Sequence, residues 1–345
     1  MNKLMFLSDY MEGCHPLVLK RLNETNLESS SGYGTDIYSL AAKEKINKIL
    51  DEDNDIYFVC GGTQTNFIVI DTILKGYEGV LTIDTSHIAT HEAGAIEFSG
   101  HKVITLPNIN GKIKAEDIDQ YMTNFYNDTS YPHMVMPKMV YISYPTEYGT
   151  IYSKEELINI RKVCDKYNMY LYCDGARLAY GLKASSNELT FAEFAKFFDV
   201  FYIGGTKCGL LMGEAIVIRN NNLKTGFFTS IKMHGGLLAK GRILGIQFDT
   251  LFTDNLYFKI GTSAIECASI LKEGFKKLNL VEYINSDTNQ LFIILDNNKY
   301  KELIKYVDVT YFGTYDKNNT IVRFVTSWAT KKEDCYKLLD ILEKL

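Results

Sequence analysis

Short β-rich runs alternate with longer amphipathic segments along the first two thirds of the chain. These apolar runs lie at residues 56–60, 80–83, 102–106, 139–143, 169–173 and 199–204. Between the fourth and fifth runs, Ser153 and Glu156 have the spacing of a helical capping box, and apolar residues follow at helical intervals. Such strand, helix, strand units predict an α/β fold with a mostly parallel central sheet and flanking helices.

The alternation changes after about Phe252. Residues 253–345 begin with a long helical pattern, which is followed by strands at 291–295 and 321–325 and by a final helix from about Lys331. We therefore expect two domains. The large domain comprises residues 1–252 and includes the N-terminal segment, whereas residues 253–345 form a smaller α+β domain.

Charge and composition narrow the classes of function. With 37 basic and 42 acidic residues, the chain has a net charge of −5, so neither nucleic acid nor a membrane surface is an expected partner. No apolar run approaches the roughly 18 residues of a membrane-spanning helix, and the first residues lack a signal-peptide core. The seven cysteines include no C-x-x-C pair, which predicts reduced thiols in a cytoplasmic protein without a metal site.

Three segments that follow predicted strands contain candidate chemistry, because ligands bind at the carboxyl ends of parallel strands. In the first, residues 60–66, two glycines precede hydroxyl and amide residues that open a helix. Backbone N–H groups at Gly62 and Thr63 could bind a phosphate there. The segment lacks the lysine of a nucleotide P-loop and the third glycine of a dinucleotide motif. An ordinary turn without a ligand explains it equally well.

The other two segments contain an acid and an amine. Asp174 ends an apolar strand and Arg177 follows three residues later, so Asp174 could pair with Arg177, cap the next helix or bind a cationic ligand. Lys207 lies among small residues directly after another apolar strand. Its amine either extends to solvent or, when desolvated, is available for Schiff-base formation.

Together the three segments fit pyridoxal phosphate, which needs a phosphate site, a carboxylate for its ring nitrogen and an imine-forming lysine. The chain also resembles the low-specificity threonine aldolases, within the β-eliminating lyase group of fold-type-I pyridoxal-phosphate enzymes. The resemblance extends over nearly the whole chain. Its segments are LSD at 7–9, GTDIY at 34–38, GTQTN at 62–66, HIATHEAG at 87–94, DGAR at 174–177, Lys207, TNQLF at 288–292 and IVRFVT at 321–326.

The resemblance implies a cofactor role for several residues. Lys207 would be the Schiff-base lysine, and Asp174 would pair with the pyridine nitrogen. His87 would stack on the cofactor ring, although without the resemblance it reads as a solvated loop histidine. Gly62 and Thr63 would bind the phosphate.

The resemblance also implies a substrate site. Arg177 would lie beside the cofactor and the substrate carboxylate, and Arg323 would bind that carboxylate together with Ser8. The alternative for Arg323 is a surface charge on an edge strand. Where the family commonly has a histidine that meets the substrate hydroxyl, this chain has Glu147, which could act as a base or be a structural acid.

The implied reaction is retro-aldol cleavage of threonine or allo-threonine to glycine and an aldehyde. Two alternatives remain, namely β-elimination or transamination with the same cofactor, and a non-catalytic α/β protein that binds a phosphate metabolite. We expect a homodimer or homotetramer with shared active sites, for which the 24 tyrosines and 19 phenylalanines supply apolar surface. Lys232, Lys240 or Arg242 could then reach a phosphate across the subunit boundary.

Overall fold

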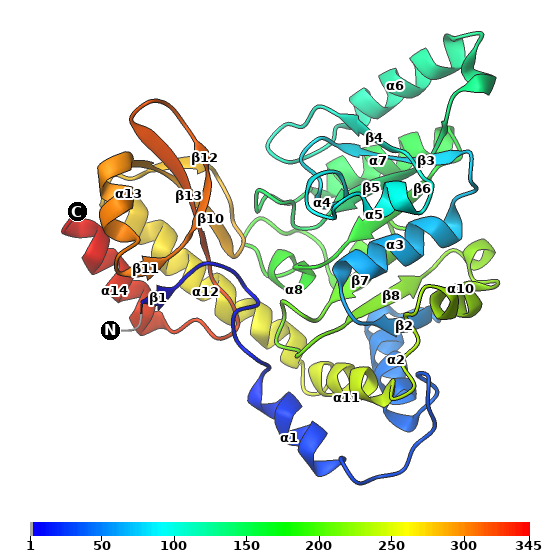
Figure 1. The fold of residues 1–345 in the computed structure, drawn as a ribbon, viewed down its shortest axis with the longest axis horizontal. Coiled ribbons are helices and arrows are strands. Elements are labelled where there is room, and N and C mark those ends of the chain that lie inside the picture. Colours follow the sequence, from blue (N-terminus) through cyan, green and yellow to red (C-terminus); the bar gives the residue numbers. More distant parts are fainter. Residues whose placement is uncertain (1–2) are drawn as a thin grey trace.

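Seven strands form the central sheet of a larger lobe in a computed structural model that describes residues 3–345 (Figure 1). In spatial order they are β2 (Asp55–Val59), β8 (Glu214–Ile218), β7 (Val200–Gly204), β6 (Tyr170–Asp174), β5 (Met136–Ser143), β3 (Glu78–Ile83) and β4 (Val103–Leu106). β8 pairs antiparallel with β2 and β7, whereas all other pairs are parallel. All strands except β8 therefore run in one direction, and their carboxyl ends share one edge.

The six runs predicted for this sheet are confirmed as β2, β3, β4, β5, β6 and β7. β8 was not predicted, because it is a short strand that returns from β7 as a hairpin with no helix between the two. The predicted capping box is also confirmed at the start of α7 (Lys154–Lys166). There the Ser153 hydroxyl accepts from the Glu156 amide at 3.2 Å, and the Glu156 carboxylate accepts from the Ser153 amide at 2.7 Å.

Helices cover both faces of the central sheet (Figure 1). The remaining helices of this lobe are α1 (Pro16–Glu24), α2 (Ile37–Leu50), α3 (Gly62–Ile73), α4 (His87–Thr90), α5 (Ala95–Phe98), α6 (Ala115–Asn127), η1 (Tyr131–His133), α8 (Leu178–Gly181), α9 (Phe191–Ala195), η2 (Asn221–Leu223), α10 (Phe227–Met233) and α11 (Arg242–Leu251). Val140 and Ile142 of β5 belong to the core beneath α2, α6, α7 and α11, whereas Met139 and Tyr141 belong to the core beneath α3 and α10. Both faces are thus buried, as in other parallel sheets.

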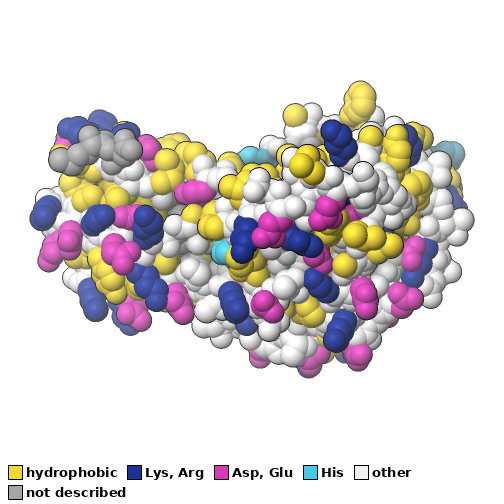
Figure 2. Space-filling view, turned by 90° about the horizontal axis from the view of Figure 1, so that it is seen from below, with side chains coloured by type: hydrophobic (Ala, Val, Ile, Leu, Met, Phe, Trp, Pro, Cys, Tyr) yellow, Lys and Arg dark blue, Asp and Glu magenta, His cyan; other side chains and the backbone are white. Residues whose placement is uncertain are grey.

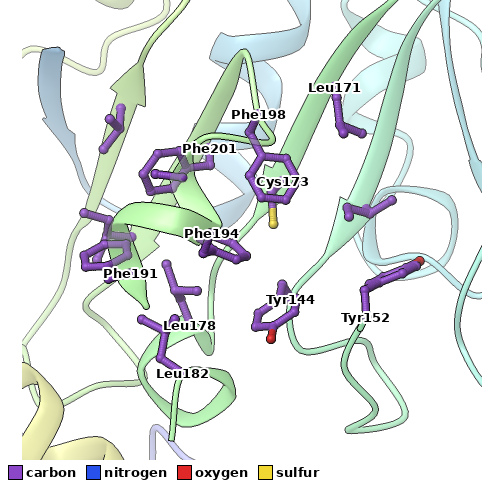
Figure 3. Close-up of a cluster of buried hydrophobic side chains, with 14 of the residues drawn as sticks. Tyr144, Tyr152, Leu171, Cys173, Leu178, Leu182, Phe191, Phe194, Phe198 and Phe201 are labelled. Atoms are coloured by element: carbon purple, nitrogen blue, oxygen red, sulfur yellow. The ribbon is translucent and has the colours of Figure 1, made fainter. Parts of the chain in front are cut away.

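Buried aromatic rings support the strands that end at the candidate site. Figure 3 shows this cluster beside β6 and β7. The Phe194 ring lies edge-on to Phe201 at a centroid distance of 5.9 Å, and it also contacts Tyr144 at 4.8 Å. Because the cluster excludes water and is densely packed, it holds the carboxyl ends of β6 and β7 in fixed positions.

The smaller lobe is built on a four-stranded antiparallel sheet, in the order β12 (Thr310–Thr314), β13 (Asn319–Val325), β10 (Gln290–Asp296) and β9 (Val281–Ile284). Its helices are α12 (Leu256–Lys277), α13 (Asn297–Leu303) and α14 (Lys332–Glu343). The two predicted strands and the final helix of this region are confirmed as β10, β13 and α14. The first half of α12 contributes side chains to the core of the larger lobe, and its second half contributes to the core of the smaller lobe. This helix therefore joins the two lobes (Figure 1).

The N-terminal segment packs on the smaller lobe, although the prediction for residues 1–252 placed it in the large domain. β1 (Leu4–Met5) pairs in parallel with β11 (Val307–Asp308), and Phe6 belongs to the same apolar core as Phe324. A two-residue strand has no pattern that identifies its partner, and only the tertiary structure shows it. The domain boundary near residue 252 stays a prediction.

The surface in Figure 2 shows two lobes joined by a narrower middle, with acidic and basic side chains interspersed. Within residues 3–345, no helix has the combined length and apolar character that crossing a bilayer requires. The same residues contain no group of three or more histidine, cysteine or acidic side chains placed to hold a metal ion.

Candidate active site

The shared edge of the central sheet brings together residues that are far apart in sequence. Gly62 follows β2, His87 follows β3, Glu147 follows β5, Asp174 ends β6 and Lys207 follows β7. Because these strands are parallel, every one of these residues emerges at the same edge. Asp174 ends β6 and Lys207 follows β7, and these two strands pair directly.

Asp174 is buried and receives several hydrogen bonds. Its Oδ1 accepts from the Tyr202 hydroxyl at 2.5 Å, and its Oδ2 accepts from the Tyr141 hydroxyl at 2.6 Å and from Asn66 Nδ2 at 3.2 Å. Burial by itself raises the pKa of this carboxyl, but the His87 charge and the hydrogen bonds outweigh it, so the pKa is lowered. Asp174 is therefore a carboxylate held ionised inside the protein.

Arg177 pairs with Asp9 rather than with Asp174. Arg177 Nε donates to Asp9 Oδ2 at 2.6 Å and Nη2 donates to Oδ1 at 3.2 Å, in a buried bidentate pair. Asp9 also accepts from Asn289 Nδ2 at 2.9 Å. Neither structural role left open for Asp174 is observed. Arg177 pairs with Asp9, and α8 (Leu178–Gly181) begins without a side-chain cap, while Asp174 Oδ1 accepts from the Ala176 amide at 3.0 Å in the turn before that helix.

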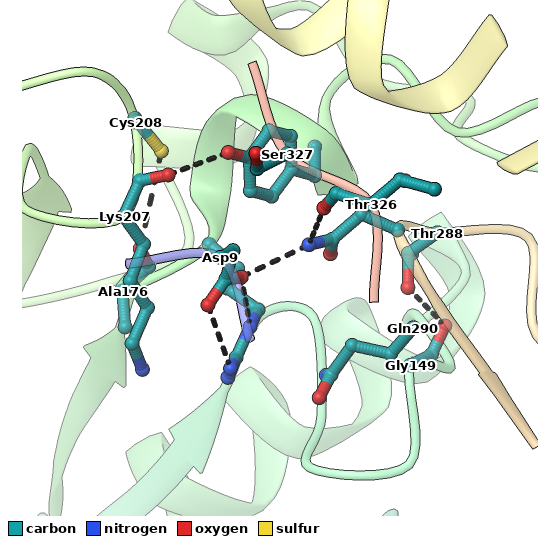
Figure 4. Close-up of polar contacts among 12 residues, drawn as sticks. Asp9, Gly149, Ala176, Lys207, Cys208, Thr288, Gln290, Thr326 and Ser327 are labelled. Carbon is teal, nitrogen blue, oxygen red and sulfur yellow. Dashed lines mark hydrogen bonds and ion pairs between the residues drawn. The ribbon is translucent and has the colours of Figure 1, made fainter. Parts of the chain in front are cut away.

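Lys207 lies in the hairpin loop between β7 and β8, and this loop is held through its backbone. The Tyr180 hydroxyl donates to the Lys207 carbonyl, and the Gly205 amide donates to Glu214 Oε2 at 2.9 Å. Burial raises the pKa of Glu214 to about 8, so this carboxyl is largely protonated at neutral pH. The Lys207 charge lowers the pKa of Asp9, and Figure 4 shows both side chains in one cluster.

His87 begins α4 and is half-buried. Its Nδ1 is 2.7 Å from Glu92 Oε1, an oxygen that also accepts from Asn66 Nδ2 at 2.7 Å. Burial disfavours the charged imidazole, but Glu92, Glu147 and Asp174 together outweigh burial, so the pKa of His87 is raised. Asn66 donates to both Glu92 and Asp174 and thereby joins the two buried acids.

Glu147 lies on the turn of residues 146–150 and is half-buried. Within residues 3–345, no group hydrogen-bonds to its carboxylate. Its charge nevertheless raises the pKa of both His87 and Arg177, so the three side chains lie within electrostatic reach of one another. Glu147 therefore lies near His87 and Arg177.

Arg323 lies on β13, an inner strand of the smaller sheet, which excludes the edge-strand alternative. Its Nη1 donates to Gln290 Oε1 at 3.1 Å and its Nη2 donates to Thr310 Oγ1 at 3.2 Å. The Thr310 hydroxyl also donates to the Leu7 carbonyl at 2.9 Å, which brings the N-terminal segment and Ser8 next to Arg323.

Within the described residues, two buried donors lack partners where the N-terminal segment meets β13. Ser8 Oγ and Arg323 Nε are both buried, and neither has a hydrogen-bond partner in residues 3–345. Burial and the nearby Arg177 charge lower the pKa of Arg323. Unsatisfied buried donors cost free energy, and a bound carboxylate would relieve that cost.

The start of α3 can hold a second anion. α3 has 12 residues and begins at Gly62 without a side-chain cap, so its first N–H groups are available. A Cβ at Gly62 would lie 3.2 Å from the Tyr202 hydroxyl, so glycine suits this close approach. Thr63 is exposed on the first turn.

The basic residues considered for a phosphate lie near α1 and α2. Arg242 donates to the carbonyls of Glu28 and Thr25, the latter at 2.6 Å, so its guanidinium supports the backbone there. Lys232 lies over the Tyr33 ring at 4.5 Å, and Lys240 is exposed. Their contact with a phosphate stays a prediction.

Comparison with known proteins places this geometry in a family. The model of the beta-eliminating lyase family matches residues 6–298. The chain belongs to the beta-eliminating lyase family. It is 30% identical to the low specificity L-threonine aldolase of Pseudomonas sp. (strain NCIMB 10558), over 77% of this chain and 76% of that protein.

Solved structures confirm the fold of this lyase family member. The threonine aldolase of Leishmania major superposes with a TM-score of 0.95 and 40% sequence identity, over 99% of both chains. Cystalysin from Treponema denticola, whose structure contains pyridoxal 5'-phosphate, has the same fold at 16% identity and a TM-score of 0.73, over 100% of this chain and 91% of that one. The fold-type-I architecture predicted from the sequence is therefore confirmed.

Several site residues of the lyase were not singled out by the sequence. Tyr141 and Tyr202 donate to Asp174, Glu92 holds His87, and Gln290 holds Arg323. Tyr141 and Tyr202 are polar positions inside apolar strands, on the same sheet face, and that pattern was a usable signal. Glu92 and Gln290 carried no comparable signal, because their partners are defined only by the tertiary contacts.

We predict that Asp9→Asn destabilises the lyase in a pH-dependent way. The pKa of Asp9 is lowered from its ordinary value of 3.8, since the Arg177 and Lys207 charges outweigh burial. This stabilisation is complete above pH 3.8 and is lost as the pH falls through the lower folded-state pKa. At pH 7 the variant should lose about 3–5 kcal/mol of unfolding free energy, measured by urea denaturation, and the difference should shrink in acid.

The matched control is Asp308→Asn, which breaks the exposed pair with Lys3. Its expected cost is below about 1 kcal/mol, because solvent screens surface pairs. Equal losses in the two variants at pH 7 would show that the Asp9–Arg177 pair contributes nothing special to stability.

Proposed function

We propose that this chain is a pyridoxal-phosphate-dependent threonine aldolase, which cleaves threonine or allo-threonine to glycine and acetaldehyde. The observation that carries the proposal is the placement of ionised Asp174 and of Lys207 at the ends of neighbouring strands, beside the anion site at Arg323. Its relatives in Pseudomonas and Leishmania major bear the threonine aldolase name.

The residues present fit the cofactor. The N–H groups of Gly62 and Thr63 would hold the phosphate, Asp174 would keep a proton on the ring nitrogen, and Lys207 would bond to the aldehyde. His87 would cover the ring. Bound pyridoxal phosphate supplies an electron-accepting ring that stabilises the charge released when a bond to Cα breaks.

The substrate carboxylate would bind at Arg323 and Ser8, whose buried donors have no other partner in residues 3–345. Arg177 has Nε and Nη2 engaged with Asp9, so its Nη1 is the group left to meet a ligand. Fixing the carboxylate orients the bonds at Cα, and the bond held perpendicular to an adjacent π system is the one that breaks.

We predict that Glu147 accepts the proton of the β-hydroxyl group. Glu147→Gln should then lower kcat by about 10²-fold, the usual size of a general-base contribution, with little change in KM. The measurement is acetaldehyde release from threonine. Glu155→Gln, on the exposed face of α7, is the matched control and should keep the wild-type rate. An unchanged kcat in Glu147→Gln would assign the proton to another base.

Product analysis tests the function directly. The purified protein, supplied with pyridoxal phosphate, should release equal amounts of glycine and acetaldehyde from threonine. β-Elimination would release ammonia and a 2-oxo acid, and transamination would form a 2-oxo acid only with an amino-group acceptor. A protein that binds the cofactor and forms no product would match the non-catalytic alternative. Binding is measurable through Trp328, the one tryptophan in the sequence, whose Cγ would be 3.7 Å from a Cβ on Gly209 in the Lys207 loop.

We further infer that the chain forms a homodimer or homotetramer. Apolar side chains on and between α1 and α2 are exposed, including Leu27 at 94% and Ile37 at 66%. A second copy would bury them favourably. Light scattering should give a mass at least twice the 39.3 kDa of one chain. A cytoplasmic location stays an expectation.

A further inference from the structure

The backbone of the turn that carries Glu147 is hydrogen-bonded to the smaller lobe. The hydroxyls of Ser286 and Thr288 both donate to the Gly149 carbonyl at 2.9 Å, and these contacts are buried. Figure 4 shows the contact from Thr288. Gly149 has a φ of +71°, and a Cβ there would lie 2.3 Å from Ser286 Oγ. Only glycine allows this close approach.

Aromatic packing also holds the same turn against the smaller lobe. The Tyr148 ring lies edge-on to Phe292 of β10 and Phe312 of β12, at centroid distances of 6.2 and 5.6 Å. The turn thus extends from β5 of the larger lobe, but its backbone and its side chain are both held by the smaller sheet.

Gln290 joins this turn to the anion site. Its side chain is fully buried, its Oε1 accepts from Arg323 Nη1 at 3.1 Å, and its Nε2 donates to the Thr146 carbonyl at 3.5 Å. A single amide therefore contacts both the guanidinium of Arg323 and the backbone next to Glu147.

We propose that Gln290 is a positioning residue that holds Glu147 at a set distance from the carboxylate bound at Arg323, and thereby sets the selectivity between threonine and allo-threonine. The inference rests on the proposed function. The two substrates differ only in the configuration at Cβ. Once the carboxylate is fixed, their hydroxyls point in different directions, and a rigidly held base favours one of them.

Three single substitutions separate the two contacts of Gln290. Gln290→Met removes both and should raise KM and lower kcat, each about fivefold, while changing the ratio of kcat/KM for the two substrates about fivefold. Thr310→Val removes the contact to Arg323 and the contact to the Leu7 carbonyl, leaves both contacts of Gln290 in place, and should raise KM with the ratio kept. Thr288→Val loosens only the turn and should lower kcat and change the ratio, with KM kept.

If Gln290→Met folds poorly, a second variant can test the same proposal. Gln290→Glu retains the contact to Arg323 as an ion pair but replaces the donor toward the Thr146 carbonyl with an acceptor. It should change the substrate ratio, and it should also raise KM, because the added negative charge competes with the substrate carboxylate for Arg323. A ratio equal to that of wild type would overturn the proposal.

Amide hydrogen exchange of the cofactor-bound protein gives a readout independent of turnover. Exchange of residues 146–150 should be about tenfold faster in Gln290→Met and unchanged in Thr310→Val. If Gln290→Met matches Thr310→Val in both exchange and substrate ratio, Gln290 only supports Arg323 and the inference fails. If the wild type releases glycine from neither substrate, the proposed function fails instead, and the selectivity claim falls with it.

Discussion

A Lys207→Ala variant is expected to cleave threonine at least about 10⁴-fold more slowly than the wild-type protein and to lack the visible absorbance of the bound cofactor. The amine of Lys207, which follows β7, can form an imine with an aldehyde. Because the loop is held by backbone contacts from Tyr180 and Glu214, removing the side chain leaves the loop in place. Rate and absorbance are measured on the same sample, with unfolding free energy as a check on the fold.

The matched control for this variant is Lys196→Ala, which removes an exposed lysine at the end of α9. It should retain both rate and absorbance. Reduction of the cofactor-bound wild type with borohydride should also leave the cofactor attached to the peptide that contains Lys207, as detected by mass spectrometry. Attachment to a different lysine, or full activity in Lys207→Ala, would refute the central assignment.

Asp174→Asn is expected to lower kcat by about 10²- to 10³-fold and to weaken cofactor binding about tenfold. The pKa of Asp174 is lowered, so the wild-type residue supplies a buried negative charge for a protonated ring nitrogen, and asparagine supplies none. Asparagine also replaces one carboxylate oxygen with the donor Nδ2. Because Tyr141, Tyr202 and Asn66 all donate to the carboxylate in the wild type, at least one of these hydrogen bonds would become a contact between two donors. We expect a further loss of about 1–3 kcal/mol in unfolding free energy.

Cofactor affinity in this variant is measured by titrating the Trp328 fluorescence, and kcat by acetaldehyde release. Asp165→Asn is the control, since Asp165 is an exposed partner of Arg161 on α7 and lies outside the site. If Asp174→Asn keeps a wild-type kcat, the carboxylate does not serve the ring nitrogen, and its role is limited to its hydrogen bonds within the protein.

The spacing of apolar residues was enough to predict most strands of the central sheet and the α7 capping box. Both depend on contacts within a few residues, so the local pattern specifies them. The convergence of Asp174 and Lys207 was also predictable, because parallel strands place their carboxyl ends at one edge whatever the details of packing. Pairing in β8 escaped prediction, since a short apolar run does not reveal strand direction.

The sequence by itself thus determined the α/β order of elements, the edge at which the candidate residues emerge and the acid and amine expected there. Only the tertiary structure decided which distant partners meet: Arg177 with Asp9, the N-terminal segment with the smaller lobe, and the Glu147 turn with Ser286 and Thr288. The periodicity of helices and strands depends on neighbouring residues, so the pattern of apolar residues in the sequence reveals it. The choice among many possible polar partners depends on which groups lose water together when the lobes pack, and no local pattern records that.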